Sequence, residues 1–333
     1  MSSKKVFIIG PGFIGWNILD LLAQEKYSVT GYVRRKEHGE LIKASGASDV
    51  VYGDLSNSAL ITEHTVAHDI VIHTATADDL PSVKAVLDGI QQRAEKGLST
   101  IYIHTSGSAM TNDGACGAFK STKIYRDSEP AEIDSIPADA PHREIDMAIV
   151  QAKKSLGAKA KIAIMIPPII HGLNSSHGRL SITMPILTRY ALKYGFAGHV
   201  GEGLSVHSTI HVLDLARGYV VLLHHLESSS PSDTQVLNNP YYFCDSTDDK
   251  EPSWKEIAAV IGEGLHKAGK ISDPTPRTIP KDTYGDVFGE LTEAVMGLNS
   301  RIRAVRLREL GWKPVEKDLK AAYMEDELPI LLK

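Results

Sequence analysis

Short apolar segments alternate with segments of helical spacing through the first half of the chain. The apolar segments are residues 5–10, 28–35, 49–55, 69–75, 100–108 and 161–168. Between them lie segments whose apolar side chains recur at helical intervals, at residues 15–26, 40–45, 59–68, 82–96 and 141–154. Buried strands that alternate with helices form a parallel sheet covered on both faces. The pattern predicts an α/β fold with a Rossmann-type doubly wound parallel sheet.

A glycine-rich turn follows the first predicted strand directly. In VFIIGPGFIGWNIL, Gly10, Gly12 and Gly15 form the pattern G-x-G-x-x-G, with Phe13 and Ile14 inside it. The first glycine of this pattern permits a tight turn, the second lets the backbone approach a pyrophosphate, and the third lets the helix pack closely on the strand. The helix N-terminus then presents free N–H groups to the phosphates. The turn therefore predicts a dinucleotide-binding site.

The end of the second predicted strand bears on which dinucleotide is bound. NAD enzymes usually carry an acidic residue about 20 residues after the glycines, where it bonds the ribose 2′-hydroxyl. Here the segment YVRRKEH supplies Arg34 and Arg35 instead. Guanidinium groups can bind a 2′-phosphate through two parallel hydrogen bonds. We therefore expect NADP(H) rather than NAD(H); the alternative is a pair of solvated surface arginines.

The regular alternation loosens after about residue 170. Helical spacing returns at residues 179–195 and 253–269, and residues 208–227 read as a short strand followed by a helix. We expect an NADP-binding Rossmann domain over residues 1–170, with contributions from about 205–245. Residues 171–333 would mainly form a smaller C-terminal α/β substrate lobe over the carboxyl ends of the strands, where open α/β sheets bind ligands.

Composition excludes several classes of protein. The 333 residues carry a formal net charge of −5, and no segment is dense in Lys and Arg, which argues against a nucleic-acid partner. The two cysteines are far apart and lack metal-ligand spacing, so we expect no metal site and a reducing compartment. No apolar run approaches the roughly 18 residues of a membrane span. We expect a cytoplasmic monomer or homodimer, without a membrane partner, that binds a small-molecule substrate.

Seven short segments occur in an informative order along the chain. They are GPGFIG, VRR, GDL, IVIHTATA, IYIHTSGS, IMIPPIIHG and STIHVLDLARGYV. This order resembles the extended short-chain dehydrogenase/reductase superfamily, and within it the atypical NmrA-like and epimerase/dehydratase-like members common in fungi. The resemblance covers roughly residues 4 to 265. The glycine turn departs from the usual T-G-x-x-G-F-I-G form, because it is one residue shorter and contains Pro11.

The resemblance implies cofactor contacts outside the glycine turn. Asp54 and Leu55 match the position that contacts the adenine. The three residues after the fourth predicted strand match the segment that lines the pyrophosphate and ribose, namely Thr74, Ala75 and Thr76. The segment that packs along the nicotinamide corresponds to Pro167 and Pro168.

The superfamily's catalytic dyad is missing at its usual place. Its hydride chemistry uses a Tyr and a Lys four residues apart on the helix after the fifth strand, with a Ser or Thr at the end of that strand. Ser106 matches this Ser, but no Tyr-x-x-x-Lys follows it before the sixth predicted strand. Tyr125 is the only tyrosine there, and it precedes the predicted helix. At the matching spacing the helix carries His142 and Asp146.

Four interpretations of this pair stay open. In the first, Asp146 orients His142 as an acid/base group. In the second, the two residues form a helix N-terminal pair without chemistry, with Asp146 favoured by the helix dipole. A metal site would need further ligands, and none cluster nearby. In the last, the proton donor lies elsewhere, and the candidates are a bound water, Tyr125, His171, Tyr190 and His207.

The substrate lobe offers only weak candidates for contacts. His171 and His177 flank the loop GLNSSHGRL, which we expect to face the substrate cleft, and Tyr190 belongs to a possible pocket wall with Tyr125 as a further candidate. The first hypothesis is an NADP(H)-binding oxidoreductase that reduces a small carbonyl, imine or enone. The alternative is a non-catalytic NADP(H)-sensing regulator of the NmrA-like type. An epimerase or dehydratase is less favoured, because those reactions also use the Tyr–Lys pair.

Overall fold

Seven parallel strands form the central sheet of the computed structural model, which describes residues 4–248 and 250–333. The strands are β1 (Lys5–Ile9), β2 (Ser28–Val33), β3 (Asp49–Tyr52), β4 (Ile70–His73), β5 (Thr100–Thr105), β7 (Ala160–Ile166) and β11 (Tyr241–Phe243). Their order in the sheet is β11-β7-β5-β4-β1-β2-β3. The chain reverses its direction of winding at β1, as in doubly wound sheets. The predicted Rossmann-type α/β class is confirmed; residues 1–3 of the predicted first domain lie outside the described residues.

Burial explains why these segments read as continuous apolar runs. Every residue of β4 and β5 is buried, and so are the last four residues of β1. A strand covered by helices on both faces has no solvent side, so its sequence shows no polar alternation.

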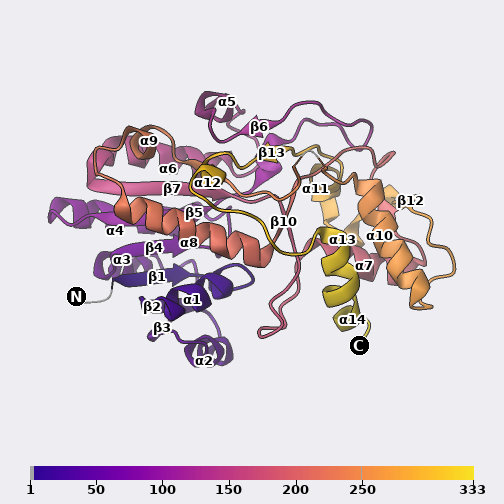
Figure 1. Cartoon of the computed structure of the whole chain (residues 1–333), viewed down its shortest axis with the longest axis horizontal. Coiled ribbons are helices and arrows are strands. Elements are labelled where there is room, and N and C mark those ends of the chain that lie inside the picture. The colour runs from indigo at the N-terminus through magenta and orange to yellow at the C-terminus, as the bar shows by residue number, and fades with distance from the viewer. Residues whose placement is uncertain (1–3, 249) are drawn as a thin grey trace.

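Helices cover both faces of the sheet (Figure 1). The covering helices are α1 (Gly15–Gln24), α2 (Lys36–Ala44), α3 (Ser58–Ala67), α4 (Leu80–Glu95), α6 (Arg143–Leu156) and α8 (Val212–Ser228). α4 packs between α3 and α6, whereas α1 packs against α8. Although α8 and β11 come late in the chain, both pack with the N-terminal sheet, where β11 is the edge strand beside β7.

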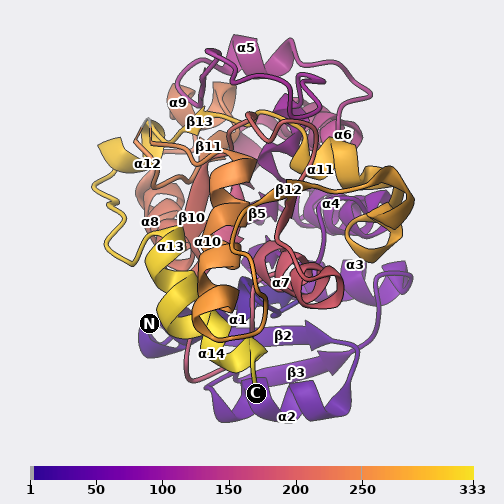
Figure 2. The same cartoon turned by 90° about the vertical axis from the view of Figure 1, so that its right-hand side faces the viewer.

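The remaining elements form a lobe beyond the carboxyl ends of the strands (Figures 1 and 2). Its helices include α7 (Thr183–Tyr194), α10 (Trp254–Lys267), α11 (Thr292–Met296), α13 (Leu319–Ala322), a π-helical turn (Tyr323–Glu327) and α14 (Leu328–Leu331). These helices enclose a second apolar core around Trp254 and Tyr190. The shorter helices α5 (Pro130–Asp134), α9 (Thr234–Asn238) and α12 (Arg306–Glu309) lie along the connections.

Three short parallel pairs of strands tie the connections together. They are β8 (Ile169–His171) with β10 (Thr209–His211), β9 (Gly198–His199) with β12 (Arg277–Thr278), and β6 (Tyr125–Arg126) with β13 (Ile302–Arg303). Each pair joins segments far apart in sequence, so the chain crosses between the sheet and the lobe several times.

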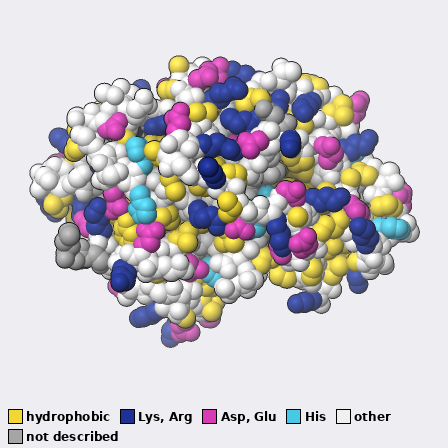
Figure 3. Space-filling model, viewed as in Figure 1, with side chains coloured by type: hydrophobic (Ala, Val, Ile, Leu, Met, Phe, Trp, Pro, Cys, Tyr) yellow, Lys and Arg dark blue, Asp and Glu magenta, His cyan; other side chains and the backbone are white. Residues whose placement is uncertain are grey.

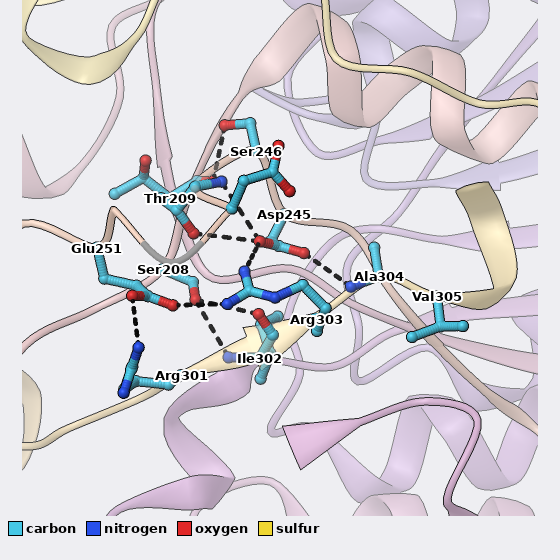
Figure 4. A network of polar contacts seen from close by, with 12 residues as sticks. Ser208, Thr209, Asp245, Ser246, Glu251, Arg301, Ile302, Arg303, Ala304 and Val305 are labelled. Carbon is cyan, nitrogen blue, oxygen red and sulfur yellow. Dashed lines mark hydrogen bonds and ion pairs between the residues drawn. The ribbon is translucent and has the colours of Figure 1, made fainter. Parts of the chain in front are cut away.

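A buried ionic network fixes one of these crossings (Figure 4). Arg303 bonds Asp245 at 2.9 Å and Glu251 at 3.1 Å, and Arg301 bonds Glu251 at 3.0 Å. Both carboxylate side chains are fully buried. Removing one partner of such a network costs about 3–5 kcal/mol, because the other charge stays buried. The network holds the segment that also brings the Ser300 hydroxyl within 2.9 Å of the Ser108 carbonyl, just after β5.

The surface shows no single dominant charge on the face seen in Figure 3. Lys, Arg, Asp and Glu side chains are interspersed there, with apolar side chains between them. Within residues 4–248 and 250–333, no helix is both long enough and apolar enough to cross a membrane.

Candidate active site

A cleft of about 1030 Å³ lies along the carboxyl ends of the strands. The turn after β1, the end of β2 and the segments after β4, β5 and β7 line it. Ligands of open α/β sheets bind at this edge, where the winding reverses. The predicted cofactor residues that line the cleft are Gly10, Gly12, Phe13, Ile14, Arg34, Arg35, Asp54, Leu55, Thr74, Ala75, Thr76, Pro167 and Pro168. The one predicted cofactor residue that does not line it is Gly15.

Steric contacts with the rest of the protein explain two of the three glycines of the turn but not the third. Gly10 has a φ of +78°, and a Cβ there would lie 2.5 Å from the Cα of Ala75. A Cβ at Gly15 would collide with the Thr74 hydroxyl. At Gly12, by contrast, the nearest atom is the Arg179 Nη1 at 3.6 Å. The protein's own packing therefore requires Gly10 and Gly15, whereas Gly12 leaves its backbone accessible from the cleft.

Three arginines gather at the nucleotide end of the cleft. Arg34 and Arg35 come from the end of β2, and Arg179 comes from the loop between β8 and α7. Among the described residues, none of the three forms a salt bridge with a carboxylate. Asp54 lies nearby, but its carboxylate accepts hydrogen bonds from Ser56, which are the main reason its pKa is lowered. The sequence analysis missed Arg179, because nothing local indicates that its loop reaches this end of the sheet.

Ser106 lies at the opposite end of the cleft and is paired with Asp146. Its hydroxyl donates to the Asp146 Oδ2 at 3.0 Å. Asp146 is fully buried in the first turn of α6, and its Oδ1 has no hydrogen-bond partner. Burial raises the pKa of this carboxyl to about 7, although the bond from Ser106 acts in the opposite direction. Asp146 itself does not line the cleft.

His142 also lines the cleft, but its carboxylate partner is not the predicted one. Its Nδ1 lies 2.7 Å from the Asp78 Oδ1. On the other side of the ring, Nε2 lies 2.8 Å from the point that a Cβ on Gly107 would occupy. Gly107 therefore allows the imidazole to approach the backbone beside Ser106. Asp78 follows β4 and was missed by the sequence analysis, because it is 64 residues away in the chain.

Of the four interpretations, the one in which Asp146 orients His142 does not hold, and the reason is local. The helix begins at Arg143, and His142 precedes it with a left-handed φ of +67°. Residues four apart share a face only when both are helical. The left-handed residue turns its side chain toward Asp78, while Asp146 turns toward Ser106.

The weak substrate candidates lie outside the cleft. Tyr125 is in β6, and Tyr190 is buried in the second core with its hydroxyl 2.9 Å from that of Thr283. His171 is buried against His211, and burial lowers its pKa to about 3. His177 stacks on Trp16 of α1 with ring centroids 4.0 Å apart. The loop GLNSSHGRL does reach the cleft, but through Arg179 at the nucleotide end, and neither His171 nor His177 lines the cleft.

Four side chains were named in the sequence analysis as alternative proton donors. Of these, only His207 lines the cleft. Its Nδ1 lies 2.8 Å from the Ser208 carbonyl. Burial lowers the pKa of its imidazole to about 4, so the ring is neutral at physiological pH. Because the ring is neutral and hydrogen-bonded to the backbone, we expect His207 to line the cleft without acting as the proton donor.

Comparison with known proteins agrees with the fold and with the nucleotide end of the cleft. Residues 10–131 match a family described as NAD(P)H-binding. The protein YLL056C of Saccharomyces cerevisiae is 25% identical over 96% of this chain and 99% of its own length. The oxidase ucsJ of an Acremonium species is 28% identical over 94% of this chain and 93% of its own length.

Solved structures resemble the whole chain at low sequence identity. A UDP-glucose 4-epimerase from Thermotoga maritima has a TM-score of 0.67 at 15% identity, covering 99% of this chain and all of the epimerase. The yeast methylglyoxal/isovaleraldehyde reductase Gre2, solved with NADPH, has a TM-score of 0.60 at 16% identity and covers 98% of each chain. These structures show that the chain shares the fold of such epimerases and reductases, in agreement with the expected resemblance, and the family match adds NAD(P)H binding over residues 10–131.

Proposed function

We propose that this chain is an NADP(H)-dependent oxidoreductase that reduces a small carbonyl, imine or enone. The observation that carries the proposal is the position of His142 beside Ser106 in the cleft that also contains the glycine turn. The lining of one cleft thus includes both a glycine turn suited to a dinucleotide and a hydroxyl and an imidazole on neighbouring segments. The similarity to a protein named as an oxidase and to the fold of an NADPH-bound reductase supports this class of reaction.

The cofactor, when bound, supplies the hydride, and the side chains manage the substrate and the proton. The Ser106 hydroxyl positions the reacting oxygen or nitrogen of the substrate. The His142 Nε2 lies beside Gly107, the neighbour of Ser106, and from there the protonated imidazole donates its proton to that atom and becomes neutral. Asp78 binds Nδ1, which holds the ring and determines which nitrogen faces the cleft. His142 and Asp78 together take the place of the missing tyrosine and lysine.

Asp146 acts on Ser106 rather than on His142. While Asp146 is ionised, the Ser106 hydroxyl donates to it and can offer the substrate only lone pairs. When Asp146 is protonated, the carboxyl can donate to Ser106 and free the hydroxyl proton for a substrate oxygen. Because the pKa of Asp146 is about 7, both forms are populated near neutral pH.

Arg34 and Arg35 support NADP(H) over NAD(H), since both line the cleft and neither is paired with a carboxylate among the described residues. We expect NADPH to quench or enhance protein fluorescence at concentrations at least about tenfold below those needed for NADH. The variant Arg34→Gln/Arg35→Gln should lose this preference, whereas Arg126→Gln, an exposed control outside the cleft, should keep it. If the wild-type protein bound NADPH and NADH with equal affinity, the proposed preference for NADP(H) would be wrong.

A regulatory NADP(H) sensor of the NmrA-like type is the second candidate function. The observation that favours it is the buried carboxyl of Asp146 at the position of the superfamily's lysine. The two candidates are distinguished by mixing bound NADPH with a panel of small carbonyls, imines and enones and following loss of the nicotinamide absorbance. Oxidation of NADPH by any member supports the enzyme; tight binding without oxidation by all members supports the sensor.

A further inference from the structure

Residues 172–181, called the strap here, cross from the C-terminal lobe to α1. They leave β8, pass beside the N-terminal elements and return to α7 (Figure 1). Asn174 donates to Asn17 at 2.9 Å, and His177 lies 2.8 Å from Asp20 while stacking on Trp16. The strap is therefore docked along the helix whose N-terminus faces the nucleotide end of the cleft.

One buried carboxylate holds both ends of the strap. The Gly172 N–H donates to the Glu327 Oε1 at 2.6 Å, and the Ser181 hydroxyl donates to the Oε2 at 2.7 Å. Glu327 belongs to the π-helical turn near the C-terminus and is fully buried. With its ends fixed and its middle docked, the strap presents its side chains in a defined place.

Arg179 is the strap residue that enters the cleft. Its guanidinium lies 5.5 Å from the centre of the Trp16 ring, and its Nη2 lies 3.3 Å from the His38 Nδ1. Its Nη1 lies 3.6 Å from the Cβ position of Gly12. Gly12 is the glycine whose backbone approaches the pyrophosphate in dinucleotide-binding turns. The arginine thus stands over the phosphate-binding part of the turn.

The surroundings of Arg179 favour an anion. The side chain is half-buried, and both this burial and the positive charge of Arg35 lower its pKa. Among the described residues, no carboxylate pairs with it. A partly desolvated guanidinium near a second one is unfavourable unless an anion is bound between them. Phosphate oxygens match the hydrogen-bonding geometry of guanidinium groups.

We propose that Arg179 is a phosphate ligand of the bound dinucleotide, carried to it by the strap. The proposal rests on the proposed binding of NADP(H) and adds a third arginine, from the other lobe, to the pair on β2. Two phosphates of the dinucleotide are candidates, the pyrophosphate, which would bind at Gly12, and the 2′-phosphate, which would bind at Arg35. Because the strap is docked on α1, whose N-terminus faces the nucleotide end of the cleft, we expect that loosening it will speed release of the nucleotide.

The test compares Arg179→Gln, Arg179→Lys and Arg189→Gln by titration with NADPH and with NADH. Arg189 is an exposed residue of α7 outside the cleft and serves as the matched control. Loss of a charged hydrogen bond should weaken binding by Arg179→Gln about tenfold or more, with a smaller loss for Arg179→Lys and none for Arg189→Gln. If Arg179→Gln loses affinity equally for both dinucleotides, Arg179 binds the pyrophosphate. If it loses affinity for NADPH alone, Arg179 binds the 2′-phosphate.

Unchanged affinities of a folded Arg179→Gln for both dinucleotides, with tight NADPH binding by the wild-type protein, would overturn the assignment and leave the proposed function standing. Failure of the wild-type protein to bind either dinucleotide would overturn both. His177→Gln provides a second variant, because it removes the stack on Trp16 and the contact with Asp20 but keeps the Arg179 side chain. We expect NADPH to dissociate several-fold faster from it in stopped-flow measurements; an unchanged rate would contradict the strap's part in retention.

Discussion

The two ends of the cleft differ in how their residues are assembled. At the nucleotide end, the glycine turn is a single continuous segment whose geometry is required by its contacts with Thr74 and Ala75. At the reacting end, Ser106 bonds a residue 40 positions away, and His142 bonds one 64 positions away. Compared with the superfamily that the sequence resembles, the reacting end lacks the Tyr–Lys pair, whereas the glycine turn keeps its three glycines although it is one residue shorter than usual.

The reacting end is tested first by His142→Ala, which should have the largest effect. Loss of a general acid typically lowers turnover by about 10²- to 10⁴-fold, and NADPH affinity should stay within a few-fold because the nucleotide end is untouched. Steady-state oxidation of NADPH measures both quantities. The control is His224→Ala, an exposed histidine of α8 that pairs with Glu25. Full turnover by His142→Ala would show that the proton comes from elsewhere.

Asp146 should make the stability of the protein depend on pH. Burial raises its pKa from 3.8 to about 7, so the native state holds this proton more tightly than the unfolded chain does. Its contribution to the free energy of unfolding is therefore full below about pH 4 and is lost as the pH rises through about 7, by up to about 1.4 kcal/mol per pH unit.

The variant Asp146→Asn lacks this titration. We expect its free energy of unfolding, measured with urea, to change less than that of the wild-type protein across this interval. Its turnover should also decline less with rising pH, because the amide can donate to Ser106 at every pH. The exposed Asp139→Asn should behave like the wild-type protein. Parallel pH profiles for Asp146→Asn and wild type would contradict the raised pKa.

The nucleotide end is tested by comparing Gly10→Ala with Gly97→Ala. Both glycines have positive φ, +78° and +71°, so both substitutions strain the backbone. Only the methyl group at position 10 also meets Ala75, whereas nothing lies within 4 Å at position 97. We expect Gly10→Ala to lower the free energy of unfolding by about 1–3 kcal/mol more than Gly97→Ala and to weaken NADPH binding. Equal losses would mean that the turn can relax away from Ala75.

Asp78→Asn should have the smallest effect on turnover. It keeps the size of the side chain but weakens the hold on the His142 Nδ1, and orienting partners of this kind are typically worth about tenfold or somewhat more. Since Asp78 is exposed, we expect no loss of thermal stability. A lowered kcat with an unchanged melting temperature would indicate that Asp78 orients His142, whereas a lowered melting temperature would indicate a structural role. A kcat equal to that of the wild-type protein would leave His142 oriented by other contacts.

The sequence predicts what depends on neighbouring residues and misses what depends on distant ones. The strands, the glycine turn and the cleft residues contributed by strand ends follow from local spacing, because parallel strands bring their carboxyl ends to one edge. The left-handed backbone of His142 has no such signal, since the contacts that its ring makes there involve Asp78 and Gly107, which lie on other segments of the chain. Arg179 is similar, because its place depends on a buried carboxylate near the C-terminus that fixes the strap.

The most direct test of the account is a single-turnover experiment in which bound NADPH is mixed with reactive members of the substrate panel. The central claim is that both ends of the cleft serve one reaction. We predict rapid oxidation by the wild-type protein and little by Ser106→Ala or His142→Ala, with all three binding NADPH about equally. Oxidation at the wild-type rate by both variants would contradict the assigned reacting end, and tight binding with no oxidation by the wild-type protein would contradict the proposed catalysis itself.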